Sequence, residues 1–213
     1  MSSKAEGTGR HARRREQTRR KLLDAARMLF ARQGVEPTRI NEITDEADVG
    51  FGSFYNHFES KEAIVEAVLA EIVTAQAAAI DSVAAGLDDP AEVVSAAHRY
   101  FVRLAGSDPN WGWLLVRLDL SHKISVQALG PFAERDLDRG IAAGRFRVPN
   151  KRVALMASGG ALLGVMQDVL EGRAPKDADR HHAEGVLRML GLTAEDAAEV
   201  ARRRQPRIPL PEI

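Results

Sequence analysis

The stretch TRINEITDEADVGFGSFYNHFESK, at residues 38–61, predicts two short helices joined by a tight turn and followed by the start of a longer helix. The run 47–50 breaks the first helix, because Asp48 tolerates a left-handed backbone better than most residues and Gly50 adopts it freely. One apolar face precedes this turn, at the spacing of a helix. Its members are Ile40, Ile43 and Ala47.

The second short helix is expected over residues 51–58. Phe54 and Phe58 lie four residues apart, so both can face inward and leave the other side chains exposed. Two short helices with this connection have the pattern of a helix-turn-helix, whose second helix enters the major groove of DNA.

The flanking residues extend the pattern in both directions. A helix over 16–33 carries an apolar stripe and ends at Gly34. Thr38, after Pro37, is expected to cap the next helix, whose end can also accept a phosphate. Ser60 is expected to cap a long helix that runs to about residue 85.

These residues resemble the tetracycline-repressor (TetR) family of bacterial transcription regulators over residues 16–75. The resemblance implies an all-α protein: a DNA-binding domain at 15–75, with its helix-turn-helix at about 38–57, and a helical ligand-binding and dimerisation domain at 76–205. The matching positions are Leu22, Leu23, Ala25, Ala26, Leu29, Phe30, Gly34, Thr38, Ile43, Ala47, Val49, Gly52, Tyr55, His57, Phe58 and Lys61.

The bulk composition supports helices and sets limits on the function. Aromatic residues make up only 5% of the 213 residues, while Ala and Leu are plentiful, which favours helices over sheets. The chain has no cysteine, so disulfides and thiolate metal sites are excluded. No apolar run of about 20 residues and no signal peptide are evident, so we expect a cytoplasmic protein without membrane contact.

The formal net charge is zero, with 30 basic and 30 acidic residues, yet the basic residues are concentrated near the N-terminus. Residues 10–32 hold nine Lys or Arg side chains against two acidic ones. A local patch of this kind suits phosphate binding. Residues 1–14 are expected to be a disordered basic arm, which either touches DNA or remains a solvated tail.

The rest of the chain shows helix-start signals and no convincing strand. Asp89-Pro90, Asp108-Pro109, Asn150 and Thr193 each open an expected helix. Residues 122–143 are expected to be helical with an interruption at Gly130-Pro131. The tail at 206–213 is rich in proline and expected to be extended.

The helix over 151–171 is apolar nearly all round, so we expect it to be buried on more than one side. Its small residues would allow close approach of another helix. Together with the helix over 177–190, it is the expected homodimer interface, which would place two recognition helices about 34 Å apart on a palindromic operator.

Ten residues are candidate DNA contacts, several of them only by the family resemblance. Tyr55, His57 and Lys61 would bind phosphates. Phe51 cannot hydrogen-bond a base edge; it either packs on a thymine methyl group or folds back onto the protein. The full set is Arg19, Thr38, Arg39, Phe51, Gly52, Ser53, Tyr55, Asn56, His57 and Lys61.

Aromatic and methionine side chains of the C-terminal domain are candidates for lining a ligand pocket, with plain core packing as the alternative. Arg117 would pair with an acidic ligand or form a surface salt bridge. No cofactor is expected, and one pair of Asp177 with His181 is too little for a metal site. The candidates are Phe101, Trp111, Trp113, Leu114, Arg117, Leu118, Phe132, Met156, Leu163, Met166 and Gln167.

The sequence therefore predicts a sequence-specific transcriptional regulator, a homodimeric repressor released from double-stranded operator DNA by a small-molecule effector. The alternative is a DNA-bound structural or interaction factor of the same fold without an effector. An enzyme is not expected, because the chain has no nucleophile elbow, P-loop, dinucleotide fingerprint or metal triad.

Overall fold

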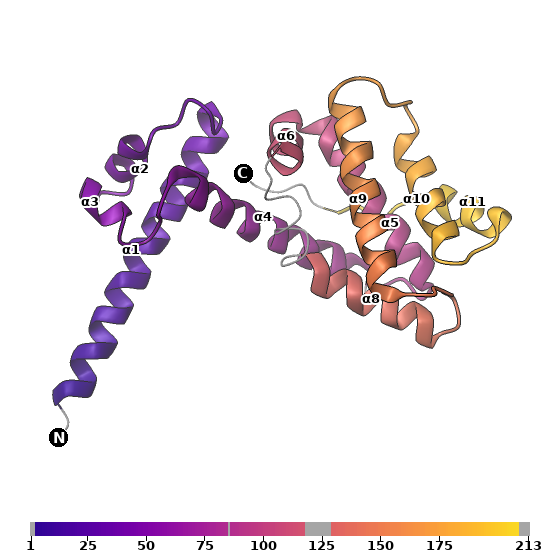
Figure 1. The fold of residues 1–213 in the computed structure, drawn as a ribbon, viewed down its shortest axis with the longest axis horizontal. Coiled ribbons are helices and arrows are strands. Elements are labelled where there is room, and N and C mark those ends of the chain that lie inside the picture. The colour runs from indigo at the N-terminus through magenta and orange to yellow at the C-terminus, as the bar shows by residue number, and fades with distance from the viewer. Residues whose placement is uncertain (1–2, 85, 118–128, 209–213) are drawn as a thin grey trace. The chain divides into compact units, whose positions relative to one another are not determined.

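The computed structural model describes residues 3–84, 86–117 and 129–208, and the regular elements within these ranges are all helices (Figure 1). The predicted all-α class is therefore confirmed. Two compact units divide at Ile72 and Val73, so the helix α4 (Lys61–Ala84) contributes its first half to the N-terminal unit and its second half to the C-terminal unit.

The N-terminal unit consists of α1 (Ser3–Gln33), α2 (Ile40–Glu46), α3 (Phe51–Phe54) and the first half of α4. Its helices meet on their apolar faces, as the periodicity predicts. The large buried apolar side chains of this unit include Leu22, Leu23, Leu29, Ile43, Phe54, Phe58, Ile64, Val65 and Leu69.

α1 is longer than predicted. It begins at Ser3, so most of the residues expected to form a disordered arm are helical. Arginine and alanine are good helix formers, and the run of them at 10–15 continues into the helix without a breaker. The composition that indicated disorder is therefore also compatible with extension of the helix.

The turn of the helix-turn-helix follows the prediction at Asp48 but not at Gly50. Asp48 adopts a left-handed conformation at φ 52°, whereas Gly50 is extended, with φ −65° and ψ 143°, and occupies the N-cap position of α3. α3 itself is shorter than the predicted 51–58, because residues 55–57 form a turn. The amides of His57 and Phe58 still bond to the carbonyl of Phe54, which directs Phe58 into the core.

Thr38 does not cap α2, so that prediction is wrong. Arg39 occupies the cap position, and its backbone N–H donates to the carboxylate of Glu42 at 2.7 Å. The Thr38 hydroxyl instead donates to the carbonyl of Gly34 at 2.7 Å and is buried. It closes the loop between α1 and α2, and this local bond competes with capping.

Among the described residues, the C-terminal unit contains the second half of α4 and six further helices. Its helix starts follow the predicted caps: Asp89, Asn150 and Thr193 each accept a bond from the first helical turn. The six helices are α5 (Pro90–Ser107), α6 (Pro109–Arg117), α8 (Gly130–Ala142), α9 (Lys151–Leu170), α10 (Ala178–Met189) and α11 (Ala194–Arg202).

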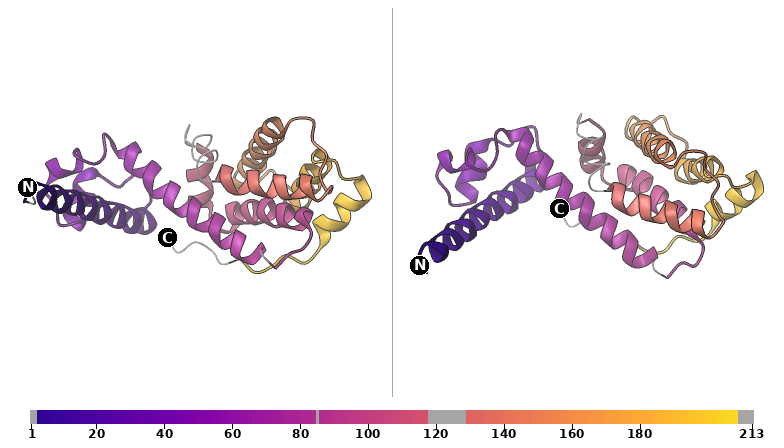
Figure 2. Two further views of the ribbon diagram at one scale, coloured as in Figure 1. Left: turned by 90° about the horizontal axis from the view of Figure 1, so that it is seen from below. Right: turned by 60° about the horizontal axis from the view of Figure 1, so that its bottom comes forward.

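α5 is the centre of this unit. It packs against α6, α8, α9, α10 and α11. Figure 2 shows the helices of this unit from two further sides. Pro131 lies in the first turn of α8, so it opens this helix rather than interrupting one. The part of the predicted helix at 122–128 lies outside the described residues.

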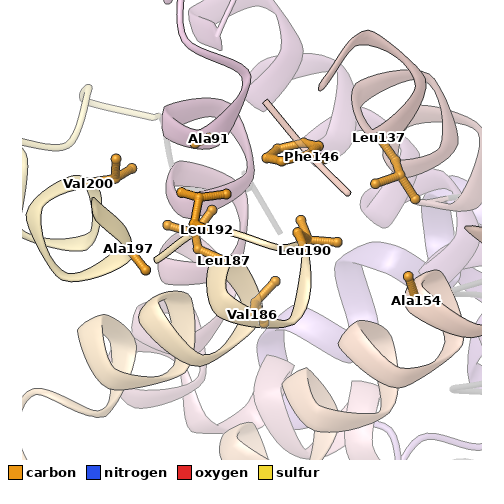
Figure 3. Packing of buried hydrophobic residues seen from close by; sticks show 10 residues of the cluster. All are labelled: Ala91, Leu137, Phe146, Ala154, Val186, Leu187, Leu190, Leu192, Ala197 and Val200. Carbon is orange, nitrogen blue, oxygen red and sulfur yellow. The ribbon is translucent and has the colours of Figure 1, made fainter. Parts of the chain in front are cut away.

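One apolar cluster joins α5, α8, α9, α10 and α11 (Figure 3). The ring of Phe146 packs so close to Gly140 that a β-carbon at this position would lie 1.9 Å from it. The cluster is formed by Ala91, Leu137, Phe146, Ala154, Val186, Leu187, Leu190, Leu192, Ala197 and Val200.

α9 differs from its prediction in burial. Val153 and Met156 are 61% and 53% exposed, so the described residues of this chain leave much of the helix uncovered. By length and composition both α4 and α9 could cross a membrane, which corrects the prediction that no such segment exists. The same two properties also describe helices that pack against protein.

Ion pairs link different helices of the C-terminal unit. Arg99, almost fully buried on α5, donates to Asp179 of α10 at 3.1 Å, and Arg103 donates to the same carboxylate at 2.7 Å. Arg145 bridges Asp89 and Asp196, so it links the loop after α8 to the starts of α5 and α11. These pairs join elements distant in sequence.

Candidate functional site

The exposed surface around α3 carries most of the predicted DNA contacts. Phe51 and Tyr55 are 53% and 52% exposed, and their rings meet edge to face at 5.7 Å. Phe51 therefore leans on Tyr55 while about half of its surface faces solvent. Gly52 is exposed too, and nothing lies within 4 Å of where its β-carbon would be, so another molecule could approach its backbone closely.

Three basic side chains of the N-terminal unit contact neutral groups. Lys61 Nζ donates to the carbonyl of Glu36 at 3.0 Å. Arg15 donates to the carbonyl of Asn56 at 3.3 Å, and the Arg19 guanidinium lies 5.1 Å from the centre of the Phe58 ring. Carbonyls and rings orient a cation without cancelling its charge, so these charges stay available for phosphates.

His57 is half-buried beside α1. Burial, with the positive charges of Arg15 and Arg19, lowers the pKa of its imidazole. The ring is therefore neutral at pH 7 and offers one N–H group rather than a full charge.

A shallow hollow gathers four of the predicted residues between α2, α3 and α4: Thr38, Arg39, Phe51 and Lys61 line it. Of these, Thr38 is buried with its hydroxyl engaged, so it serves as structure rather than as an accessible contact. Ser53 lies on α3 and is half-buried, and Asn56 lies in the turn after it and is exposed.

The C-terminal unit contains a cavity of about 580 Å³, a volume typical of small-molecule sites. Its walls come from α4, α5, α6, α8 and α9 and are mainly apolar. Five predicted pocket residues line it: Phe101, Phe132, Met156, Leu163 and Met166.

The other predicted pocket residues do not line this cavity or are not described. Trp111 is buried behind the wall and stacks on Phe101 with ring centres 6.1 Å apart. Trp113 is not among the lining residues, and the amide of Gln167 donates to Glu171 at 2.9 Å. The side chains of Leu114 and Arg117, and all of Leu118, lie outside the described part of the chain.

Sequence reasoning missed the polar residues of the cavity. Arg135 of α8 donates both terminal nitrogens to Asp81 of α4, at 2.6 and 3.0 Å, and also reaches Asp136. These bonds raise the pKa of Arg135 above its ordinary value, so the guanidinium stays charged. No local signal marks this group, because Asp81 and Arg135 stand 54 positions apart on helices whose outer faces are expected to be charged.

A histidine pair adjoins the same cavity. His98 of α5 lines it, and His98 Nδ1 lies 2.9 Å from Nε2 of His182 on α10. Burial, then the neighbouring His182, lowers the pKa of His98 to about 3, and burial lowers that of His182 to about 4. Both rings are therefore neutral at pH 7.

Family models match both units. The model for bacterial regulatory proteins of the tetR family covers residues 22–68, and that for the tetracyclin repressor-like C-terminal domain covers residues 89–203, more than half of the chain.

Individual relatives agree with these models. The HTH-type transcriptional repressor KstR2 of Rhodococcus jostii is 45% identical over 51 residues, about a quarter of each chain. The regulator TcmR of Streptomyces glaucescens is 33% identical over 93 residues, which cover 44% of this chain and 41% of that protein. The chain thus matches less than half the length of these curated relatives.

A solved structure matches almost the whole chain. RolR in complex with the ligand resorcinol is 36% identical, with a TM-score of 0.85, and the match covers 93% of this chain and all of RolR. From the fold, the exposed α3 surface and these matches, it follows that the chain belongs to the tetR family of bacterial regulatory proteins.

Proposed function

We propose that the protein is a cytoplasmic, homodimeric transcriptional repressor that leaves its operator when a small hydroxylated aromatic compound occupies the C-terminal cavity. It acts by binding rather than by catalysis. The observation that carries this proposal is the pairing of a mainly apolar cavity with an ion cluster among its lining residues, in a chain that matches RolR over nearly its full length.

The DNA-binding part rests on the surface around α3. The half-exposed rings of Phe51 and Tyr55 and the open backbone at Gly52 can enter the major groove. Arg19, Arg39, Lys61 and the neutral His57 surround them and can reach phosphates. Few of these groups read a base edge directly, so phosphate contacts, operator spacing and DNA shape are expected to supply much of the affinity and specificity.

The dimer part rests on α9. Its exposed Val153 and Met156, and the open space beside Gly159, Gly160 and Gly164, form an apolar strip that the described residues of this chain leave uncovered. A second copy related by a two-fold axis would bury the same strip on both chains. Together with the exposed Met189 of α10, this is the interface expected from the sequence.

The effector part rests on the cavity lining. Phe101 and Phe132 offer ring faces, and Met156 and Met166 adapt to an aromatic guest. The Asp81–Arg135–Asp136 cluster supplies hydrogen-bond acceptors and donors within the same lining. Because Arg135 is already paired, a neutral hydroxyl suits this wall better than a carboxylate, and resorcinol, the ligand of RolR, has this chemistry.

The experiment has two steps. Selection from a random DNA library first yields the operator, and fluorescence anisotropy then follows its release as resorcinol is added. We expect binding as a dimer without the ligand and release at saturating ligand, because the ligand must favour the DNA-incompetent state by several kcal/mol, about 5.5 for a near-complete switch. An operator complex that no hydroxylated ring dissociates would favour the effector-free DNA-bound factor instead.

A further inference from the structure

The histidine pair gives the cavity a further polar group, on a helix other than those of the ion cluster. His98 comes from α5, whereas Asp81 comes from α4 and Arg135 and Asp136 come from α8. His98 is enclosed by protein yet keeps accessible surface, and the cavity it lines accounts for that surface.

One ring nitrogen of His98 is hydrogen-bonded to His182, and the other is not. Nδ1 is bonded to His182, while Nε2 has no hydrogen-bond partner among the residues that the structure describes. A neutral imidazole has one N–H donor and one bare acceptor nitrogen. His98 Nε2 can therefore bond to a guest in the cavity.

The pair can either donate a hydrogen bond to a guest hydroxyl or accept one from it. If His182 donates its Nε2 proton to His98 Nδ1, then His98 carries its own proton on Nε2 and donates to the cavity. If His98 donates from Nδ1 to His182, then His98 Nε2 is bare and accepts from the cavity. Both states contain the same number of protons and no net charge.

The buried ion pair fixes this arrangement. Arg99 follows His98 on α5, and Asp179 precedes His182 by three residues, so it lies on the same side of α10. The bond between Arg99 and Asp179 sets the register of α5 against α10. His182 is itself buried, so it acts on a guest only through His98.

We propose that His98 hydrogen-bonds a neutral hydroxyl group of the effector through Nε2, with His182 as the positioning residue that selects its tautomer. This rests on the proposed function and assigns one specificity contact within it. A guest with two hydroxyl groups would use His98 for one and the Asp81–Arg135–Asp136 cluster for the other.

The test compares two rings of similar shape, resorcinol and meta-xylene, by calorimetric titration of the full-length protein. His98→Leu is expected to weaken resorcinol binding about tenfold and to leave meta-xylene binding unchanged, because only the first ring loses a hydrogen bond. His98→Gln, which keeps a donor and an acceptor, should recover part of the loss. His182→Leu should weaken resorcinol less than His98→Leu does, and His182→Gln should restore it.

His181→Leu is the matched control, because His181 neighbours His182 on α10 but is exposed and faces Asp177. It should change neither titration. If His98→Leu fails to fold, the ring-nitrogen resonances of His98 in the wild-type protein decide: they shift with resorcinol and not with meta-xylene if the inference is correct, and an unchanged resonance overturns it.

Two further outcomes separate this inference from the proposed function. An equal loss for both rings in His98→Leu would mean that His98 only shapes the wall, which overturns the inference and leaves the proposed effector class standing. A wild-type protein that binds its operator but no hydroxylated ring would overturn the proposed effector class and, with it, the role of His98.

Discussion

The two units treat their positive charges differently. In the N-terminal unit, Lys61 and Arg15 donate to backbone carbonyls and Arg19 lies over an aromatic ring. In the C-terminal unit, Arg99 and Arg145 are paired with carboxylates from other elements. The first arrangement keeps positive charge available for an anionic partner, while the second uses charge to fasten helices to one another. Variants that remove one charge at a time can test this contrast.

The largest effect is expected when the buried pair loses its acid. Asp179→Asn leaves Arg99, which is only 3% exposed, without a counter-charge, and should lower the free energy of unfolding by about 3 kcal/mol. Urea denaturation measures the change. The matched control is Asp138→Asn, whose own side chain is 55% exposed and whose partner Lys151 is 36% exposed, and it should lose less than about 1 kcal/mol. Equal losses would show that burial does not govern these pairs.

The histidine pair predicts a second stability effect, this one dependent on pH. The folded pKa values of His98 and His182, about 3 and about 4, lie below their ordinary value of 6.5. The unfolded chain therefore binds more protons once the pH drops below 6.5, and the stability present above that pH is progressively lost on acidification. Thermal unfolding between pH 6.5 and 4.5 should show a falling melting temperature. His98→Leu with His182→Leu should flatten that slope, and His181→Leu should not.

The N-terminal unit could largely be predicted from the sequence because its determinants are local. The apolar spacing around Ile43, the left-handed Asp48 and the cap at Gly50 act within a few residues of one another. Thr38 shows where this reasoning fails. A threonine before a helix can cap that helix, or its hydroxyl can bond to a residue earlier in the chain. Here the hydrogen bonds with Gly34 and Gln33 favour the earlier partners.

The cavity could be predicted only in part. Its apolar wall was indicated by Phe101, Phe132 and Met166, since large apolar side chains on amphipathic helices face inward. Its polar groups depend on tertiary contacts across 54 and 84 positions, between Asp81 and Arg135 and between His98 and His182. Nothing near these residues in sequence distinguishes them from a solvated helix face.

A variant of Lys61 tests the positive charge on the surface of the N-terminal unit. Lys61→Ala should weaken binding to all DNA sequences and reduce the slope of log K against log salt by about one unit, because one phosphate contact is lost. Arg20→Ala is the control, since Arg20 is already paired with Asp24 and Glu71. It should leave the salt slope unchanged. A changed preference among sequences in Lys61→Ala, without a change of slope, would contradict a phosphate contact.

The smallest effect concerns the uncharged part of the same surface, at Phe51. If its half-exposed ring packs on a thymine methyl group, replacing that thymine by uracil should weaken operator binding by about 0.8 kcal/mol, the value of one buried methyl group. In Phe51→Ala the same replacement should have no effect, while Tyr55→Phe, which keeps the neighbouring ring, should respond like the wild type. Anisotropy titrations with an operator carrying uracil at each thymine in turn would locate the contact. If no uracil changes the affinity of the wild type, Phe51 is held against Tyr55 by their edge-to-face contact, and reading of the sequence passes to Ser53, Asn56 and the shape of the DNA.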